Sequence, residues 1–339
     1  MCCAEKWKAY NLIFIIIMNR GQIPVSIITG FLGAGKTTLI NKIIEKERNK
    51  KFAVIENEFS DMPIDGALIS GLGENRVFEL ANGCICCTLG TELQETLQQL
   101  LSMDLDFNHL LIETTGIAEP DSIIQNIIAN EEIKQNFIIQ TVCCVIDALN
   151  FEEHIKEKEN VKQLVVADTV VISKIENLSV RDLESLKRQI KEYNPLCVIV
   201  PVSYGDYGDF DLIENSFFNE KSFKNLFSEV ELSGHHEHHH PEISAVGIQI
   251  NGNFDMKKFS FWMDYFLYIN QNSIFRVKGI LSFEGLSRKM IFQAVKSSYV
   301  IEEGVFWQNN EEKISKLIFI GKNLDKKAIK EGLNELIAD

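Results

Sequence analysis

The sequence lacks a hydrophobic run long enough to cross a membrane, and it lacks a cluster of basic residues. Its best membrane candidate is "LIFIIIM" at residues 12–18, far shorter than the roughly 20 residues that a spanning helix needs. The 34 basic residues are outnumbered by 48 acidic ones, which gives a formal net charge of -14. Because phosphate backbones and anionic lipids repel such a chain, we expect no nucleic acid and no membrane as partner.

Cysteine is scarce and unevenly placed, which excludes a disulfide framework. Of the eight cysteines in 339 residues, three lie between positions 84 and 87. This usage is typical of a reducing compartment, and no small-residue cleavage site follows residues 12–18. We therefore expect a cytoplasmic protein. A composition of 45% hydrophobic and 24% charged residues predicts one large globular domain or two ordinary ones.

A glycine-rich loop follows the first predicted strand. The segment "VSIITG" predicts a β-strand, and "INKIIEKERNK" has the pattern of a helix. Between them lies the complete motif GxxxxGK[ST], whose backbone N–H groups bind phosphates, whose lysine reaches the β- and γ-phosphates, and whose hydroxyl binds Mg²⁺. The predicted nucleotide-binding residues of this loop are Gly30, Gly33, Ala34, Gly35, Lys36, Thr37 and Thr38.

Further apolar segments continue the same pattern. "HLLIETTG" predicts a strand that ends in Glu113, which can hold Mg²⁺ together with Thr37, and Gly116 can sense a γ-phosphate. The alternative for Glu113 is an ordinary charged strand end. "TVCCVIDALN", with Cys143 and Cys144 predicted to be buried, and "DTVVISKIENL" follow, separated by helical stretches. This alternation predicts an α/β fold with a mostly parallel, doubly wound sheet.

The last of these strands ends in "SKIE" at residues 173–176, where many GTPases carry NKxD. In that motif the acidic residue accepts hydrogen bonds from N1 and N2 of guanine, which adenine cannot supply. Glu176 can make the same contact, whereas Ser173 lacks the amide of asparagine. We therefore predict that Ser173, Lys174 and Glu176 bind the base of GTP, with a weakened preference for guanine.

The sequence "NGCICC" offers three closely spaced thiols before a predicted helix. Thiolates suit Zn²⁺ and other thiophilic ions, and a helix N-terminus lowers thiol pKa values. The predicted metal ligands are Cys84, Cys86 and Cys87, with a carboxylate of Glu56, Glu58 or Asp61 as a fourth ligand. A redox-active or buried cysteine cluster is the alternative. Because the thiols lie between the P-loop and Glu113, a γ-phosphate could gate the metal.

A histidine-rich stretch, "SGHHEHHHPE", separates two differently patterned parts of the chain. Its imidazoles form an auxiliary site that could collect metal, with a solvated polar linker as the alternative. These residues are His235, His236, His238, His239 and His240. The aromatic run "FDMKKFSFWMDYFLYI" that follows is predicted to be a helix with its aromatic stripe in a core. The predicted divisions are an unstructured extension at 1–20, a P-loop domain at 21–228, a linker at 229–242 and a smaller α+β domain at 243–339.

Several segments together resemble the CobW-like family of P-loop GTPase metallochaperones, of the YjiA type and related to UreG and HypB. They are "TGFLGAGKTTL", "VIENEF", "NGCICC", "IETTGIAEP", "RVKGIL" and "FIGKNLD". The resemblance implies slow GTP hydrolysis with Lys36, Asp65 and Glu113 as catalytic residues. It also implies binding of Zn²⁺ or Co²⁺ at the thiols, with Glu56 or Asp61 nearby, and delivery to a client metalloprotein. A homodimer is among the expected assemblies.

Three segments depart from the family pattern, and two other functions are open. "SKIE" stands in place of NKxD, "FSDMPID" in place of FGE(V/I)xxD, and "FQAVK" lacks a histidine that is frequent there. A metal-buffering or storage protein would bind metal through the same residues regardless of nucleotide. A P-loop kinase or other ATPase would prefer ATP.

Overall fold

The computed structural model describes residues 21–57, 69–70, 77–82, 91–103, 105–116, 120–213, 220–232 and 243–338. The chain forms two compact units, one of residues 21–217 and one that contains residues 218–339. Helix α9 (Glu220–Leu232) falls in the second unit, where it packs against strands β9 (Ser244–Asn251) and β13 (Ile314–Gly321). The domain boundaries given above stay predictions.

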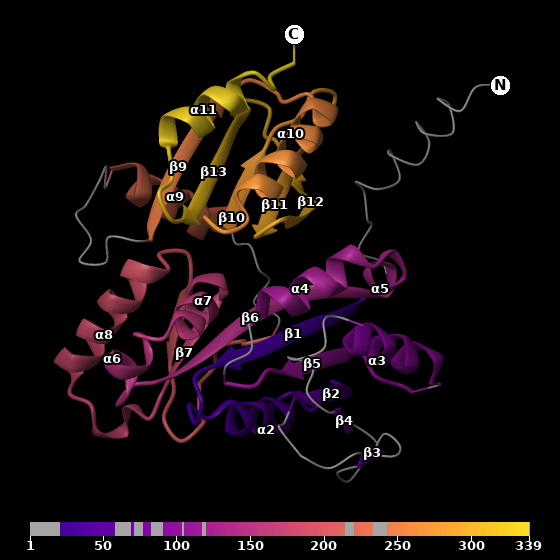
Figure 1. Ribbon diagram of the computed structural model, residues 1–339, viewed down its shortest axis with the longest axis vertical. Helices are drawn as coiled ribbons and strands as arrows, with labels where there is room; N and C mark the ends of the chain where they lie inside the picture. The colour runs from indigo at the N-terminus through magenta and orange to yellow at the C-terminus, as the bar shows by residue number, and fades with distance from the viewer. Residues whose placement is uncertain are drawn as a thin grey trace. The chain divides into compact units, whose positions relative to one another are not determined.

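The first unit is built on an eight-stranded sheet (Figure 1). Its strands are β1 (Ile23–Gly30), β2 (Phe52–Asn57), β3 (Ile69–Ser70), β4 (Val77–Asn82), β5 (His109–Glu113), β6 (Phe137–Asp147), β7 (Thr169–Ser173) and β8 (Val198–Pro201). Their order is β3-β4-β2-β5-β1-β6-β7-β8, and all neighbours are parallel except β3 and β4. The predicted mostly parallel sheet is confirmed.

Helices cover both faces of this sheet. They are α2 (Lys36–Lys46), α3 (Thr91–Ser102), α4 (Pro120–Ala129), α5 (Glu131–Asn136), α6 (Phe151–His154), α7 (Lys158–Val166), the 3-10 helix η1 (Ile175–Asn177) and α8 (Val180–Tyr193). Helices α3, α4, α7 and α8 contact one another in succession, and Figure 1 places α2 on the opposite side of the strands from α4 and α7. Among the parallel connections that contain a described helix, β1–α2–β2 runs in one direction along the sheet and the others run in the opposite direction. Right-handed crossovers therefore place α2 on the other face from α3, α4, α7 and α8.

The core of the first unit follows from its parallel strands, which are buried on both faces and are therefore apolar throughout. On β1 the side chains of Val25, Ile27 and Ile28 have no exposed surface. On β6, Cys143 and Cys144 are fully buried, as predicted. Burial of these apolar side chains stabilises the middle of the sheet, and polar residues lie at the carboxyl ends of the strands.

The second unit contains a five-stranded antiparallel sheet with the order β12-β11-β10-β13-β9. Its elements are β9 (Ser244–Asn251), α10 (Met256–Ile269), β10 (Ile274–Leu281), β11 (Arg288–Val295), β12 (Ser298–Phe306), β13 (Ile314–Gly321) and α11 (Lys326–Asn334). Its core is rich in aromatic rings: Phe254, Phe259 and Phe283 contact one another, and Phe292 packs on Phe259. This is the predicted smaller α+β domain.

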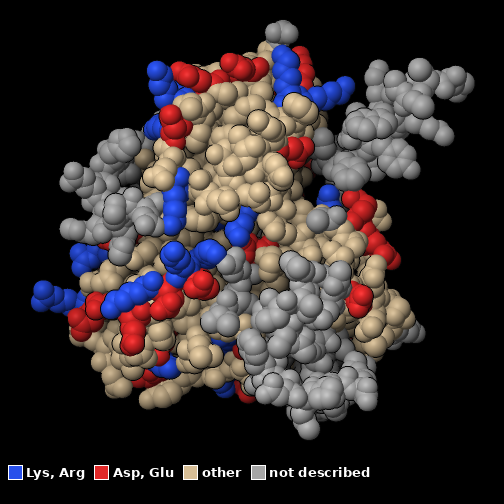
Figure 2. Space-filling view, viewed as in Figure 1, with Lys and Arg blue, Asp and Glu red and all other residues tan. Residues whose placement is uncertain are grey.

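Helix α10 corrects one expectation, because only part of its aromatic run lies in the core. Phe259, Met263 and Leu267 are buried, whereas Phe261 and Tyr265 are 80% and 62% exposed. Figure 2 shows a largely uncharged surface where Figure 1 places this helix. The predicted aromatic stripe is therefore two stripes on different sides of α10. No helix in the described part of the chain combines the length and apolarity that a membrane span requires.

Candidate nucleotide-binding site

The loop between β1 and α2 depends on two glycines. Gly30 ends β1 with φ 135°, and a Cβ there would collide with the carbonyl oxygen of Val145 on β6. Gly35 precedes α2 with φ 98°, in the left-handed region. Since side chains rarely tolerate these angles, only glycine lets the strand turn directly into the helix. The first turn of α2 thus presents its unpaired N–H groups to the loop, as phosphate binding requires.

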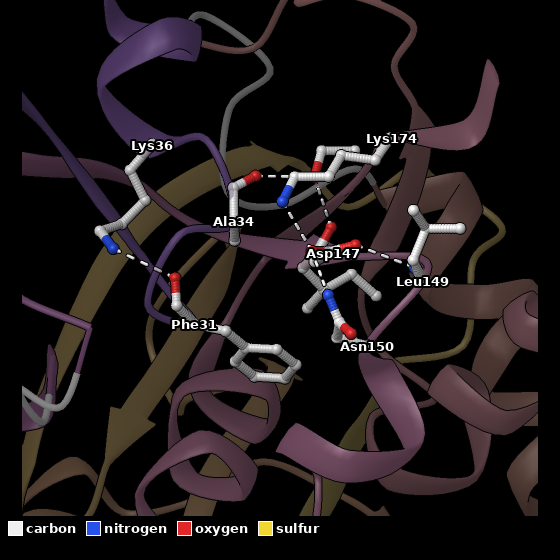
Figure 3. A network of polar contacts seen from close by, with 9 residues as sticks. Phe31, Ala34, Lys36, Asp147, Leu149, Asn150 and Lys174 are labelled. Carbon is white, nitrogen blue, oxygen red and sulfur yellow. Dashed lines mark hydrogen bonds and ion pairs between the residues drawn. The ribbon is translucent and has the colours of Figure 1, made fainter. Parts of the chain in front are cut away.

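The Lys36 side chain lies under this loop. It is 7% exposed, and its ammonium donates hydrogen bonds to the carbonyl oxygens of Gly30 at 3.2 Å and Phe31 at 3.3 Å. Figure 3 shows the second of these bonds. Burial lowers the pKa of Lys36, while Glu113 and Cys144 oppose that shift. A desolvated cation held by two neutral carbonyls gains more from an anion than from these partners. The geometry therefore suits exchange of the carbonyls for phosphate oxygens.

Thr37 and Glu113 come together although they are 76 positions apart in the sequence. The Thr37 hydroxyl lies 2.8 Å and 3.0 Å from the two carboxylate oxygens of Glu113 and donates to that group. Glu113 is the last residue of β5, in register with Ile28 of β1 and Glu56 of β2. A hydroxyl beside a carboxylate offers the hard oxygen ligands that Mg²⁺ prefers. The residues present therefore fit the ion that was predicted for them.

The segment after β5 is fixed against the P-loop. A Cβ on Gly116 would lie 2.7 Å from the Cα atom of Leu32, so the two backbones are in direct contact. Gln163 of α7 donates to the Gly116 carbonyl at 3.0 Å, and the Thr114 hydroxyl donates to that of Thr29 at 2.9 Å. Gly116 is thus adjacent to the loop that is predicted to bind the phosphates, which is the position its predicted role needs.

The SKIE segment lies beside the same loop, at the end of β7. The Ser173 hydroxyl is 2.7 Å from the Ala34 carbonyl oxygen, to which it donates, and 2.9 Å from that of Ile146. A hydroxyl therefore joins this segment to the P-loop at the position where the NKxD motif has an asparagine amide. Glu176 accepts a hydrogen bond from the backbone N–H of Tyr204 at 2.6 Å. Its own backbone N–H and that of Tyr204 lower the pKa of the Glu176 carboxyl.

Sequence reasoning missed two parts of this edge. One is Asp147, whose segment "VID" marks a strand end but received no role. The other is the turn at 203–206 after β8, in which Gly205 has φ 81° and a Cβ would lie 2.9 Å from Cγ of Lys42 on α2. The signal for both was an apolar strand followed by polar residues. Their positions beside the P-loop depend on the strand order, which places β6, β7 and β8 next to β1.

Other predicted site residues fall outside the described residues. They are Glu58, Asp61, Asp65, Cys84, Cys86, Cys87, His235, His236, His238, His239 and His240. Glu56 is described in its backbone at the carboxyl end of β2. Among the residues that the structure does describe, no group of three or more His, Cys, Asp or Glu could hold a metal ion. The metal-ligand assignments stay predictions.

Comparison with known proteins identifies the family of this chain. Residues 24–201 match the family model "CobW/HypB/UreG, nucleotide-binding domain", and residues 243–337 match the "Cobalamin synthesis protein cobW C-terminal domain". The zinc chaperone YjiA of Escherichia coli is 30% identical over 315 residues, which cover 91% of this chain and 96% of the relative.

Two further similarities extend over almost the whole chain. The zinc-regulated GTPase metalloprotein activator 1 of Saccharomyces cerevisiae is 25% identical over 370 residues, which cover 95% of this chain and 85% of the relative. The crystal structure of Zn(II)-bound YjiA GTPase from E. coli aligns with a TM-score of 0.65 at 26% identity, covering 94% of this chain and all of that one. The chain therefore belongs to the CobW/HypB/UreG family of P-loop proteins.

Proposed function

We propose that the protein is a GTP-hydrolysing metallochaperone that binds a divalent transition metal and delivers it to a client metalloprotein. Zinc is the metal we expect, and cobalt is the alternative. The observation that carries the GTPase part is the contact between Thr37 and Glu113 beside the buried Lys36. The relatives named zinc chaperones and GTPase metalloprotein activator support the metal cargo and the client.

Hydrolysis rests on positioning and on charge stabilisation of the transferred phosphoryl group. In this proposal the Lys36 ammonium leaves its two carbonyl partners and binds β- and γ-phosphate oxygens, while the first-turn N–H groups of α2 hold the phosphate chain. Thr37 and Glu113 would hold Mg²⁺, which when bound neutralises charge on the phosphate oxygens. Asp65 aligns the attacking water, and turnover is slow without a partner protein.

The cargo metal would bind Cys84, Cys86 and Cys87, with Glu56 or Asp61 as an oxygen ligand. Glu56 of β2 and Glu113 of β5 are register partners, and neighbouring strands lie about 4.8 Å apart. A predicted ligand of the cargo and a predicted ligand of Mg²⁺ thus end adjacent strands. This adjacency supports a γ-phosphate that changes the metal geometry through the segments after β2 and β5.

The test is the Zn²⁺ affinity of the full chain, measured by chelator competition with Mg²⁺ and either a non-hydrolysable GTP analogue or GDP. We expect the affinities to differ about tenfold or more, which corresponds to at least about 1.4 kcal/mol of coupling. Equal affinities would favour the metal-buffering alternative. A preference for ATP over GTP in the same protein would favour the kinase or ATPase alternative.

A pair of cysteine variants locates the metal. Replacing Cys86 and Cys87 by Ser should remove most of the tight Zn²⁺ binding, because two of three soft ligands are lost. The control is Cys197→Ala, which removes a buried thiol on another part of the chain and should leave the affinity unchanged. Tight binding that survives in the double variant would contradict the assignment to these thiols.

A further inference from the structure

A buried carboxylate that the proposed mechanism does not use lies at the end of β6. Asp147 is 2% exposed, and its carboxylate is the centre of the contacts in Figure 3. One oxygen accepts from the Leu149 backbone N–H at 2.9 Å, and the other accepts from the Asn150 amide at 2.8 Å and the Lys174 ammonium at 2.7 Å. Burial alone would raise the pKa of Asp147, but the bonds from Lys174, Asn150 and Leu149 outweigh it and lower that pKa. Asp147 is thus a fixed anion.

The partner of this anion has an unusual backbone. Lys174 has φ 58°, in the left-handed region that residues other than glycine seldom occupy. It directly precedes η1, the 3-10 helix that carries Glu176. Because the ion pair with Asp147 favours this conformation, it also favours the place of η1 and of the Glu176 carboxylate. A chain of contacts therefore leads from a buried group to the residue predicted to select the base.

The contacts on either side of Lys174 extend this arrangement. Ser173 is bonded to Ala34 of the P-loop, and Glu176 to the N–H of Tyr204 in the turn after β8. In Figure 3, Lys36 lies to the left of Ala34, and Asp147 with Lys174 lies to its right. Asp147 and Lys36 therefore lie on different sides of the P-loop residue Ala34.

We propose that Asp147 is a positioning residue for base selection: it holds Lys174, and through it η1 and Glu176, in the conformation that receives guanine. This inference rests on the proposed GTPase function and deepens it. It assigns Asp147 to substrate specificity and leaves the phosphoryl-transfer chemistry to Lys36, Thr37 and Glu113.

The experiment compares GTP and ATP hydrolysis by the full chain carrying Asp147→Asn. An Asn keeps the size of the side chain but removes the charge that Lys174 needs. We expect the ratio of kcat/KM for GTP to that for ATP to fall about tenfold, through a higher KM for GTP, with kcat at saturating GTP within about twofold of the parent.

The matched control is Asp168→Asn. Asp168 is also buried, and its carboxylate accepts a backbone N–H, that of Val142, at 2.9 Å. It precedes β7, whereas Asp147 ends the neighbouring β6, so it lies at the opposite edge of the same strand pair. The control should lose stability but keep the GTP to ATP ratio of the parent.

A second pair of variants changes the other partner of the ion pair, Lys174. Because its side chain is 44% exposed, its replacement should not prevent folding. Lys174→Met should lower the ratio as Asp147→Asn does, and Lys174→Arg, which keeps a cation near Asp147, should preserve most of it. If the variants fold, combining Asp147→Asn with Lys174→Met should cost no more than Lys174→Met alone.

The outcomes separate this inference from the proposed function. A parent protein that does not favour GTP would refute the proposed function, and the role of Asp147 in base selection with it. A parent that favours GTP, with an unchanged ratio in Asp147→Asn, would refute the inference alone. So would an equal loss for GTP and ATP, or a failure of Lys174→Arg to preserve the ratio.

Discussion

At the scale of single residues, Lys36 offers the most direct test of the P-loop. Its ammonium is buried and donates hydrogen bonds to two neutral carbonyl oxygens, those of Gly30 and Phe31. Lys36→Ala should reduce GTP hydrolysis at least about a thousandfold, because a charge contact to the transferred phosphoryl group is lost. Zn²⁺ binding should persist in the same variant. Substantial turnover, measured by phosphate release, would show that the phosphates bind elsewhere.

His109 makes stability depend on pH in a predictable direction. Its Nε2 lies 2.9 Å from the Ser26 hydroxyl, and burial is the main cause that lowers the pKa of His109 to about 3, with a smaller contribution from Lys50. Because the pKa of His109 in the folded protein lies below the ordinary value of 6.5, the folded protein favours the neutral imidazole. The stabilisation is complete above pH 6.5 and is lost as pH falls from 6.5 toward 3.

This loss can be measured against a side chain that does not titrate. Between pH 6.5 and 4.5 we expect the parent to lose up to about 1.4 kcal/mol of unfolding free energy per pH unit more than His109→Gln does. Urea unfolding at several pH values gives both curves. Parallel curves would mean that His109 is protonated in the folded protein without penalty.

At the scale of elements, the contact between the segment after β5 and the P-loop leaves no room for a side chain. In Gly116→Ala the added Cβ would lie 2.7 Å from Cα of Leu32, closer than unstrained carbon atoms approach. We expect a shifted P-loop and a GDP affinity reduced about tenfold or more, measured by titration calorimetry.

A glycine with space beside it serves as the control. A Cβ on Gly247 would meet its nearest atom, a ring carbon of Phe227, at 3.4 Å, which is an ordinary contact. Gly247→Ala should bind GDP as the parent does. Unchanged affinity in Gly116→Ala would show that the loop can yield at no cost.

The elements also explain which parts of the site could be predicted. The P-loop and Glu113 are visible in the sequence because a local motif and a strand end carry them. The bond from Ser173 to Ala34, and the ion pair of Asp147 with Lys174, join residues 139 and 27 positions apart. Such contacts depend on the order of strands in the sheet, which no local pattern encodes. The prediction of a single buried aromatic stripe on α10 was wrong for a related reason. Composition predicts a helix but does not say which of its side chains contact the core.

At the scale of the whole molecule, the chain has two units, each with its own sheet and core. Ligand binding stabilises only the structure that binds it, by about 2.7 kcal/mol when the free ligand is at 100 times its Kd. With GDP and Mg²⁺ present, we expect calorimetry to show one unfolding transition shifted upward and a second one unchanged. A single transition that shifts as a whole would show that the units unfold together.

The buried thiols of the first unit have a practical consequence for chemical labelling. Cys143, Cys144 and Cys197 are buried, and burial raises the pKa of Cys143 to about 12 and that of Cys144 well above its ordinary value. Reagents that attack thiolates, such as Ellman's reagent, should therefore pass over these three in the native protein. Any rapid colour change comes from the other five cysteines. If Zn²⁺ suppresses this colour change, the change measures Zn²⁺ binding among those five cysteines, because the three buried thiols do not react.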